Sequence, residues 1–415
     1  MEKQILYITA LFVFTCCSNP TENRKEQNQI NKKSTYSPGT FGYDIELLSK
    51  RQDLVLLQGK KAGSLVAVSP AWQGRVMTST FSGYEGESLG WINHELIQSG
   101  RTEEHINAFG GEDRFWMGPE GGQYSIYFKP GVSFTFENWF VPAEIDTEPF
   151  DIIDQGSAEV SFRKEMSLLN YSNTRFDLLV ERGVKLLDQT EVSDLLGIST
   201  AGLDMVAYET VNTITNTGKN AWTKESGMLS IWILGMFRPS ASTTVVIPFL
   251  TGPDSELGAR VNDTYFGKIP GDRSIVGEDV LFFMADGKKR GKIGIPANRV
   301  LPFMGAYNEE LNLLTIVSFT LDRRNKDYVN SMWEIQEDPF CGDVINSYND
   351  GPLDDGSQMG PFFELESSSP AAGLEPDSSL IHVHRTIHLT GDKAKLDSIC
   401  QKILGVTLAE VYAAF

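Results

Sequence analysis

The chain has 415 residues, of which 41% are hydrophobic, and it carries a formal net charge of −19 with a pI near 4.7. Such an acidic chain lacks the basic face that a phosphate backbone requires, so nucleic acid is excluded as the expected partner. About 375 residues follow the N-terminal segments described next, which is enough for one large β domain or two domains of ordinary size.

The N-terminus has the pattern of an export signal. The apolar run Ile5–Phe14 is only ten residues long, too short to span a bilayer and typical of a signal-peptide core. Cys16 and Cys17 follow directly, and the four residues that end at Cys16 resemble a bacterial lipobox, in which the cysteine is lipidated and becomes the first residue. We predict a signal peptide over residues 1–15 and lipidation at Cys16, with Cys17 as the fallback site. An ordinary cleaved signal with incidental cysteines is the competing interpretation.

The next segment, residues 16–40, is predicted to be a lipidated flexible tether. Asn19–Pro38 consists largely of Asn, Gln, Lys, Glu and Ser, with almost no large apolar residue, so it has little surface to bury. No later apolar run is long enough for a transmembrane helix. The expected location is therefore the cell envelope, with the lipid as membrane anchor at the outer membrane or the periplasmic face.

Residues 41–390 are predicted to form one all-β domain. Runs rich in β-branched and aromatic residues recur between residues 64 and 389, separated by turn residues, with no long helical window between them. The predicted strands are Ser64–Val68, Gly74–Phe81, Gln123–Phe128, Ser133–Phe140, Glu159–Leu169, Arg175–Leu187, Met205–Ile214, Leu229–Phe237, Thr243–Phe249, Val280–Met284, Leu313–Leu321, Phe362–Glu366 and Leu380–Leu389. This pattern predicts a large antiparallel sandwich of two sheets.

Residues 391–415 differ and are predicted to be a short helical tail packed on the domain. Asp392 is placed to cap a helix that ends at Gly405, and a second short helix is expected over Leu408–Phe415. The apolar stripe of the first helix consists of Leu396, Ile399, Cys400, Ile403 and Leu404. Outside the N-terminal pair, Cys341 and Cys400 are the cysteines of the chain, and either a disulfide between them or a buried free thiol at Cys400 fits an exported protein.

The segment Asn107–Gln123 is the most informative part of the chain. It holds five glycines and a proline, so we expect a tight loop and not a regular helix or strand. Between the glycines lie Glu112, Arg114, Trp116 and Glu120, a combination that suits a sugar, because charged groups bind hydroxyls and an aromatic ring binds the C–H face. The competing interpretation is a buried loop whose aromatic residues are core and whose Arg114 is paired with its own acids.

Four motifs, taken together and in order, resemble the galactose mutarotase-like, or aldose 1-epimerase-like, superfamily over most of residues 50–390. They are Gly74-Arg75-Val76-Met77, Asn107-Ala108-Phe109-Gly110-Gly111, Thr213-Ile214-Thr215-Asn216-Thr217-Gly218 and Phe363-Glu364-Leu365-Glu366-Ser367. The resemblance implies a β-supersandwich that binds a carbohydrate in the cleft of a concave sheet. It also implies that Glu366 corresponds to the catalytic glutamate of the superfamily, with Glu364 as the rival on the same strand face.

The departures from the superfamily concern its two catalytic histidines. Phe109 stands where the first histidine is expected, and Ser230 or a neighbour stands where the second is expected. Loss of a general acid forfeits a factor of roughly 10²–10⁴ in rate. Because mutarotation proceeds without an enzyme, so weakened a catalyst has little use, and the departures favour sugar recognition or a different carbohydrate chemistry.

Three histidines are expected on one face of a single strand. His382, His384 and His388 alternate there with Thr386 between them, and a His-x-His pair is close enough to share a metal. We favour a polar strand face at the rim of a cleft and predict no metal or cofactor. The acidic segment Ser347–Gly356 lacks the regular spacing of a calcium loop, and we interpret it as turns.

These observations predict a carbohydrate-binding or carbohydrate-processing lipoprotein whose partners are a saccharide and, through its lipid, a membrane. The predicted binding residues are Arg75, Glu112, Arg114, Trp116, Glu120, Trp232 and Glu364; the other tryptophans are assigned to the core. The first alternative is an aldose 1-epimerase that uses Glu366 as base with an unrecognised acid, for which His384 is the candidate. The second is a structural envelope protein without a ligand.

Overall fold

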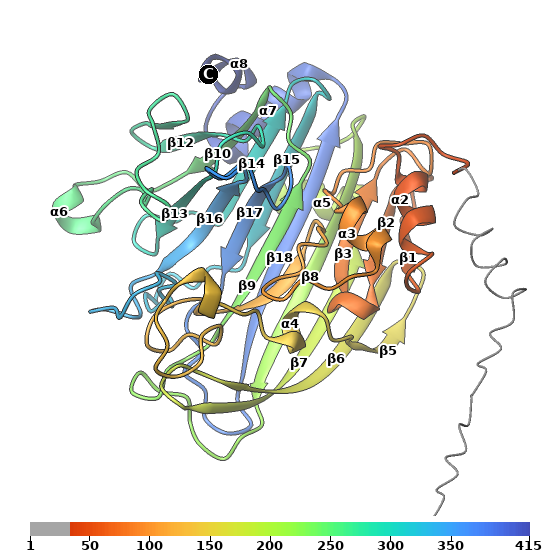
Figure 1. Ribbon diagram of the computed structural model, residues 1–415. Helices are drawn as coiled ribbons and strands as arrows, with labels where there is room; N and C mark the ends of the chain where they lie inside the picture. The colour runs from red at the N-terminus through yellow and green to blue at the C-terminus, as the bar shows by residue number, and fades with distance from the viewer. Residues whose placement is uncertain (1–33) are drawn as a thin grey trace, which may run out of the picture. The chain divides into compact units, whose positions relative to one another are not determined.

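Antiparallel strands are the main regular structure of the domain, as the periodic runs of β-branched and aromatic residues predict (Figure 1). The structure, a computed structural model, describes residues 34–415, and the predicted signal peptide and lipidation site at Cys16 lie outside them. None of the helices within residues 34–415 has the length and apolar character needed to span a membrane.

Three sheets are present among residues 34–415. The small sheet has the order β1 (Val55–Gln58), β2 (Leu65–Ser69) and β3 (Arg75–Thr80). The ten-stranded sheet has the order β11 (Ser274–Val276), β12 (Val280–Met284), β10 (Thr243–Pro248), β14 (Phe303–Asn308), β15 (Leu313–Phe319), β18 (Ser379–Thr390), β8 (Asp204–Asn216), β7 (Arg175–Leu186), β6 (Glu159–Leu169) and β5 (Asp151–Gln155). The five-stranded sheet has the order β13 (Gly291–Pro296), β16 (Asp343–Asn349), β17 (Phe363–Ser368), β9 (Ser230–Phe237) and β4 (Arg114–Gly118).

The two larger sheets pack on each other through apolar side chains. Leu365 and Ile293 of the five-stranded sheet share one core cluster with Val317 and Met304 of the ten-stranded sheet. In β7 every second residue is buried, so that strand has one covered face, whereas all eight residues of β9 are buried. Strand β9 is therefore covered on both faces, whereas β13 at the edge of the sheet has partly exposed residues. We call the face turned away from the ten-stranded sheet the outer face of the five-stranded sheet.

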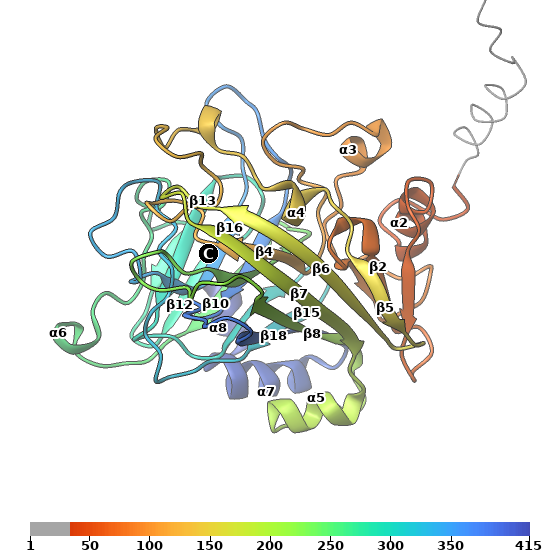
Figure 2. The ribbon, with the colours of Figure 1, turned by 90° about the horizontal axis from the view of Figure 1, so that it is seen from below.

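Helices cover part of the other side of the ten-stranded sheet. Figure 2 shows α5 (Gln189–Leu196) and α7 (Lys393–Leu404) lying against it, and their apolar residues share a cluster with Met205 and Ala207 of β8. The predicted cap and end of α7 are confirmed, because Asp392 accepts a hydrogen bond from the Lys395 amide and Gly405 has a φ of 78°.

The final helix is α8 (Leu408–Ala413), two residues shorter than predicted. Cys400 is a free thiol on the buried face of α7, and Cys341 is free and exposed, so the disulfide alternative is wrong.

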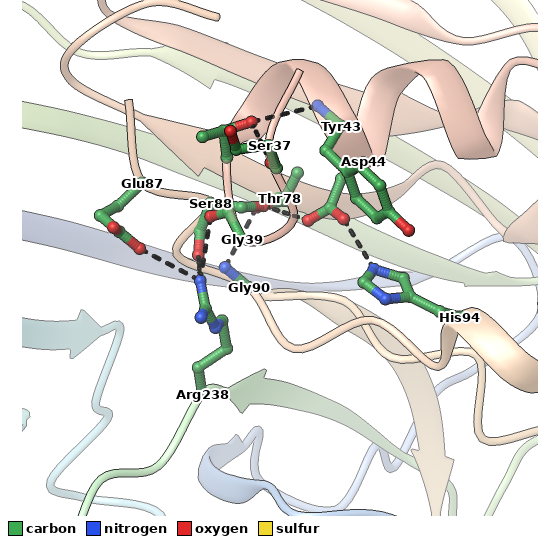
Figure 3. A network of polar contacts seen from close by, with 11 residues as sticks. Ser37, Gly39, Tyr43, Asp44, Thr78, Glu87, Ser88, Gly90, His94 and Arg238 are labelled. Carbon is green, nitrogen blue, oxygen red and sulfur yellow. Dashed lines mark hydrogen bonds and ion pairs between the residues drawn. The ribbon is translucent and has the colours of Figure 1, made fainter. Parts of the chain in front are cut away.

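The first helix of the described chain, α2 (Phe41–Leu48), is held by a polar network (Figure 3). Oδ1 of Asp44 lies 2.7 Å from Nε2 of His94, which begins α3 (His94–Ser99), and its other oxygen accepts a hydrogen bond from the Ser88 hydroxyl. Arg238, which follows β9, donates to the Gly39 carbonyl at 3.1 Å. These contacts tie the start of the domain to the five-stranded sheet. The remaining short helices are α4 (Ala143–Asp146), α6 (Asp254–Leu257) and the 3-10 turns η1 (Pro70–Trp72) and η2 (Phe136–Asn138).

Several predicted local structures are wrong. Gln123–Phe128 and Ser133–Phe140 are not strands, because their aromatic side chains pack into a cluster with Trp333 in irregular backbone. Conversely, Arg114–Gly118 in the middle of the predicted loop is strand β4. Besides β4, the strands that the sequence did not reveal are β1, β5, β11, β13, β14 and β16, several of which carry Gly, Asn, Ser or Asp and so have weak strand propensity.

Candidate functional site

Strand register brings five of the predicted site residues onto one face. Trp116 of β4 pairs with Trp232 of β9, and Leu234 of β9 pairs with Glu366 of β17. Paired residues lie on the same side of a sheet and successive residues alternate. The predicted residues on the outer face are therefore Arg114, Trp116, Trp232, Glu364 and Glu366.

Two glycines allow the tight turn of the chain segment that leads into β4. Gly110 and Gly111 have φ values of 94° and 115°, which residues with a Cβ rarely adopt. A Cβ on Gly110 would lie 2.1 Å from the Trp91 carbonyl oxygen. The glycine pair thus lets the chain turn tightly against its neighbours before Arg114 enters the sheet.

Glu366 is completely buried and makes its contacts within this face. Its Oε2 accepts hydrogen bonds from Trp232 Nε1 at 2.9 Å and from Lys292 Nζ at 3.0 Å. Its Oε1 is buried and has no hydrogen-bond partner among residues 34–415. Burial lowers the pKa of Lys292, but the nearby carboxylates, Glu366 first, outweigh this and the net shift of the pKa is upward. Lys292 is therefore a charged partner for Glu366.

Glu364 lies two residues before Glu366 on β17 and carries a perturbed pKa. Burial, and then the charge of Glu366, raise the pKa of Glu364 to about 8, although Arg114 and Lys292 act in the opposite direction. The shortest ion-pair distance, from Glu364 Oε1 to Arg114 Nη2, is 3.8 Å. The environments of the two glutamates differ. Glu364 is a protonated carboxyl group, and the neighbouring Glu366 is a carboxylate paired with Lys292.

Arg114 and Trp116 form the other half of the cluster. The Arg114 guanidinium carbon lies 3.9 Å from the centroid of the Trp116 ring, a cation–π contact. Trp116 also packs edge-on against Trp232, with ring centroids 5.7 Å apart. The Nε and Nη1 atoms of Arg114 and the Nε1 atom of Trp116 are buried, and none has a hydrogen-bond partner in the described part of the chain.

Partly exposed residues border the cluster. Glu120, which the sequence predicts, is half-buried and accepts a hydrogen bond from Trp333 Nε1 at 3.2 Å, and burial raises its pKa. Tyr265 is also half-buried, and its hydroxyl donates to Asp343 Oδ2 at 2.5 Å. Burial raises the pKa of Asp343 to about 6. Lys292 Nζ lies 4.7 Å from the Trp232 ring and 5.7 Å from the Tyr265 ring, which joins the border to the cluster.

Sequence reasoning missed part of this set. The missed residues are Tyr265, Lys292, Trp333, Asp343 and Asn346. Lys292 and Asn346 lie on β13 and β16, strands that were not predicted, so no pattern placed them near Glu366. For Trp333 the sequence offers only the indole itself, which is equally consistent with a place in the core.

Arg75 and Glu112 are not brought to this face. Arg75 is fully buried and donates to the Gly110 carbonyl at 3.0 Å and to Gln73 Oε1 at 2.9 Å. Burial, and then the charge of Arg114, lower the pKa of Arg75 to about 9.

Glu112 is equally buried and accepts hydrogen bonds from the Ser79 amide at 2.6 Å and from the Tyr208 hydroxyl at 3.1 Å. The carboxylate also lies 3.1 Å from Nε2 of His388 on β18. The partners of Glu112 thus belong to β3 and to the ten-stranded sheet. Its role as a sugar contact is not supported, because internal bonds occupy it.

His384 lies on the other side of the sheet from the Glu366 carboxylate. Its Nδ1 is 2.8 Å from the Ser367 hydroxyl, and Ser367 follows Glu366 on β17 and so points to the opposite face. The same hydroxyl lies 2.8 Å from His382 Nε2. Burial lowers the pKa of His382 to about 3 and that of His384 to about 4. The histidine face is therefore buried between the sheets and not at a cleft rim, and His384 is misplaced to serve as the acid for Glu366.

The outer face therefore brings together a defined set of chemical groups. It offers a protonated carboxyl group, a carboxylate, two cations and several aromatic rings. Among residues 34–415 no group of three or more His, Cys, Asp or Glu side chains is arranged to hold a metal ion. The arrangement can bind hydroxyl groups, stack on an apolar ring face, and donate and accept a proton.

Comparisons with known proteins show which family and which solved structures this chain resembles. The model of a family of unknown function (DUF6786) matches residues 39–415. No curated protein matches the sequence. A proposed aldose 1-epimerase from Escherichia coli K12 is similar in structure, with a TM-score of 0.50 and 11% identity over 81% of this chain and 98% of that chain. The Slr1438 protein from Synechocystis sp. PCC 6803 has a TM-score of 0.49 and 13% identity, over 82% of this chain and 97% of that chain. The predicted galactose mutarotase-like supersandwich is confirmed.

Proposed function

The chain belongs to the family of unknown function DUF6786, and we propose that it binds a carbohydrate on the outer face of its five-stranded sheet. One observation carries the proposal: Arg114, Trp116 and Glu366 converge with Trp232 on this face, and the first three keep buried polar atoms that the described chain does not satisfy. Buried polar groups are normally hydrogen-bonded, and leaving one without a partner costs about 1–3 kcal/mol. Sugar hydroxyls would satisfy these atoms, while the indoles would pack on the C–H face of the ring.

The similarity in fold to the proposed epimerase from Escherichia coli is compatible with this ligand class. We also propose that the mature protein is a lipoprotein of the cell envelope, anchored through Cys16. The support for the anchor is the short apolar run followed directly by cysteine and then by a polar segment.

A ligand-induced melting screen over mono- and oligosaccharides, with and without divalent ions, tests carbohydrate binding. A saccharide at 100 times its Kd should stabilise the folded chain by about 2.7 kcal/mol. Glycerol at the same molarity is the control, because a general co-solvent effect would raise the melting temperature without a site. If every saccharide behaves like glycerol, the proposal is wrong.

Aldose 1-epimerase activity is the second candidate, and the glutamate pair is the observation that favours it. Epimerisation needs a base for the anomeric hydroxyl and an acid for the ring oxygen. Glu366 is a suitable base, and Glu364 is a carboxyl group on the same strand face that stays protonated up to a pH of about 8. Glu364, and not His384, would then serve as the general acid.

The rate of anomerisation of freshly dissolved aldoses, followed by polarimetry, tests this activity. Glu366→Gln should lower the rate by roughly 10²–10⁴ if proton transfer is catalytic. The exposed Glu375 provides a matched control as Glu375→Gln. A parent protein that does not exceed the uncatalysed rate would exclude the epimerase and leave carbohydrate binding open.

A further inference from the structure

Arg114 differs from the other fully buried arginines among residues 34–415, because each of those donates hydrogen bonds. Arg75 donates to the Gly110 carbonyl at 3.0 Å and to Gln73 Oε1 at 2.9 Å, and only its Nε lacks a partner. Arg182 donates to Asp113 Oδ1 at 2.6 Å and to the Gly74 carbonyl at 3.0 Å, and Arg299 donates to Asp254 Oδ1 at 2.6 Å. By contrast, Nε and Nη1 of Arg114 are buried and bond to none of the described residues. Its Nη2 is 3.8 Å from Glu364 Oε1, which is too long for a hydrogen bond.

This unpaired cation is costly inside a protein unless a partner is supplied. A buried charge is stable only when it is paired and hydrogen-bonded. A guanidinium is planar and carries several N–H donors, and its geometry matches carboxylates and phosphates. Trp116 fixes the plane of the Arg114 guanidinium from one side at 3.9 Å, so the donors are held in place before a ligand arrives.

We propose that the saccharide bound at this site carries a carboxylate, as a uronic acid does, and that Arg114 recognises this group. The inference rests on the proposed carbohydrate site and adds the chemical class of its ligand.

The charges around Arg114 suit a single negative charge. Glu366 is already bonded to Lys292 and Trp232, so it does not neutralise Arg114. Asp146 also acts on Arg114, but its Oδ2 accepts hydrogen bonds from the Asn107 amide and side chain. Glu364 is uncharged at neutral pH because burial and Glu366 raise its pKa to about 8. A dianionic phosphate would meet stronger repulsion from Glu366 than a carboxylate with one charge, which is why a carboxylate is the better fit.

The same arrangement makes binding depend on pH. When the pH rises through about 8, Glu364 ionises, pairs with Arg114 and repels the ligand's carboxylate, so affinity for an acidic sugar falls above pH 8. The other charged or titratable groups that act on Glu364 or respond to it are Glu366, Arg114, Lys292, Asp350 and Tyr348. Tyr348 stays neutral in this range because burial raises its pKa, and Lys292 stays charged because the carboxylates around it raise its pKa against the effect of burial.

Titration calorimetry with matched sugar pairs tests the inference. The probes are D-glucuronate against D-glucose, D-galacturonate against D-galactose, and D-glucose 6-phosphate as a different anion. At pH 7 the parent should bind at least one uronate about tenfold or more tightly than its neutral partner, as expected for a charge-assisted bond. Arg114→Gln should lose this preference, because the uronate loses a charge-assisted bond whereas the neutral sugar loses only a hydroxyl contact. Arg324→Gln is the control, since that side chain is 92% exposed.

The possible outcomes distinguish failure of the carboxylate inference from failure of the proposed carbohydrate site. Equal binding of acidic and neutral sugars would overturn the carboxylate inference and leave the carbohydrate site standing. Tighter binding of the sugar phosphate than of either uronate would likewise overturn it. Absence of binding by every probe would overturn the inference, and failure of the wider saccharide screen would remove the site itself.

A second measurement is independent of how Arg114→Gln folds. In the parent the affinity for the uronate should fall by about tenfold between pH 7 and pH 9, while Glu364→Gln should bind with an affinity that does not change over this range. A flat profile in the parent would contradict the inference even if Arg114→Gln cannot be prepared.

Discussion

Replacement of Glu364 by glutamine should stabilise the domain in a way that depends on pH. The carboxyl group has an ordinary pKa of 4.5 and a pKa of about 8 in the folded chain, raised first by burial and then by Glu366. The folded state therefore holds this proton more tightly than the unfolded state, and stability is lost as the pH rises from 4.5 to 8. At 1.36 kcal/mol for each tenfold change, the loss is on the order of 5 kcal/mol. Glutamine resembles the protonated acid and does not titrate, so Glu364→Gln avoids this loss.

Unfolding curves of the parent and Glu364→Gln between pH 4 and pH 9 provide the assay. The two proteins should have nearly equal stability at pH 4, and the variant should gain about 6 °C in melting temperature by pH 8, since a domain of this size has an unfolding entropy of roughly 0.8 kcal/mol per degree. Glu375→Gln, an exposed substitution, should show no such trend. A difference between parent and variant that is the same at every pH would refute the reasoning, because it would mean that Glu364 is not held protonated by its surroundings.

Three further results are expected. Trp116→Ala should weaken binding of the identified saccharide by about 2 kcal/mol, or roughly 30-fold, as for a central aromatic anchor; unchanged affinity in a folded variant would show that Trp116 is only core. Leu396→Ala should destabilise the domain by about 2–5 kcal/mol, because this fully buried side chain holds α7 on the ten-stranded sheet, whereas Lys402→Ala on the exposed side of α7 should change little. Mass spectrometry of the mature N-terminus should find lipid on Cys16, and an unmodified N-terminus beyond Cys17 would contradict the lipoprotein proposal.

The elements with a regular pattern could be predicted from the sequence alone. In β7 the apolar residues alternate because one face packs on the core and the other meets solvent. The helix α7 is marked by Asp392, its apolar stripe and Gly405, since each of these meets a local requirement of helix formation. Glu364 and Glu366 could also be placed on one strand face, because side-chain alternation is a local property.

The sheet partners of the site could not be predicted. Lys292 approaches Glu366 only through the pairing of β13 with β16 and of β16 with β17, and these contacts join strands that lie far apart in the sequence. The two strands carry too many small and polar residues to stand out by their propensity.

Only the tertiary structure decided which face of each strand carries the chemistry. Every residue of β9 and β17 is buried, so neither strand shows an alternating pattern that would distinguish the outer face from the core. His384 lies on a strand of the ten-stranded sheet, and only the packing of the two sheets turns it toward Ser367 and away from the Glu366 carboxylate. The raised pKa of Glu364 has the same origin, because it depends on burial and on Glu366 held beside it, and burial is set by packing and not by local sequence.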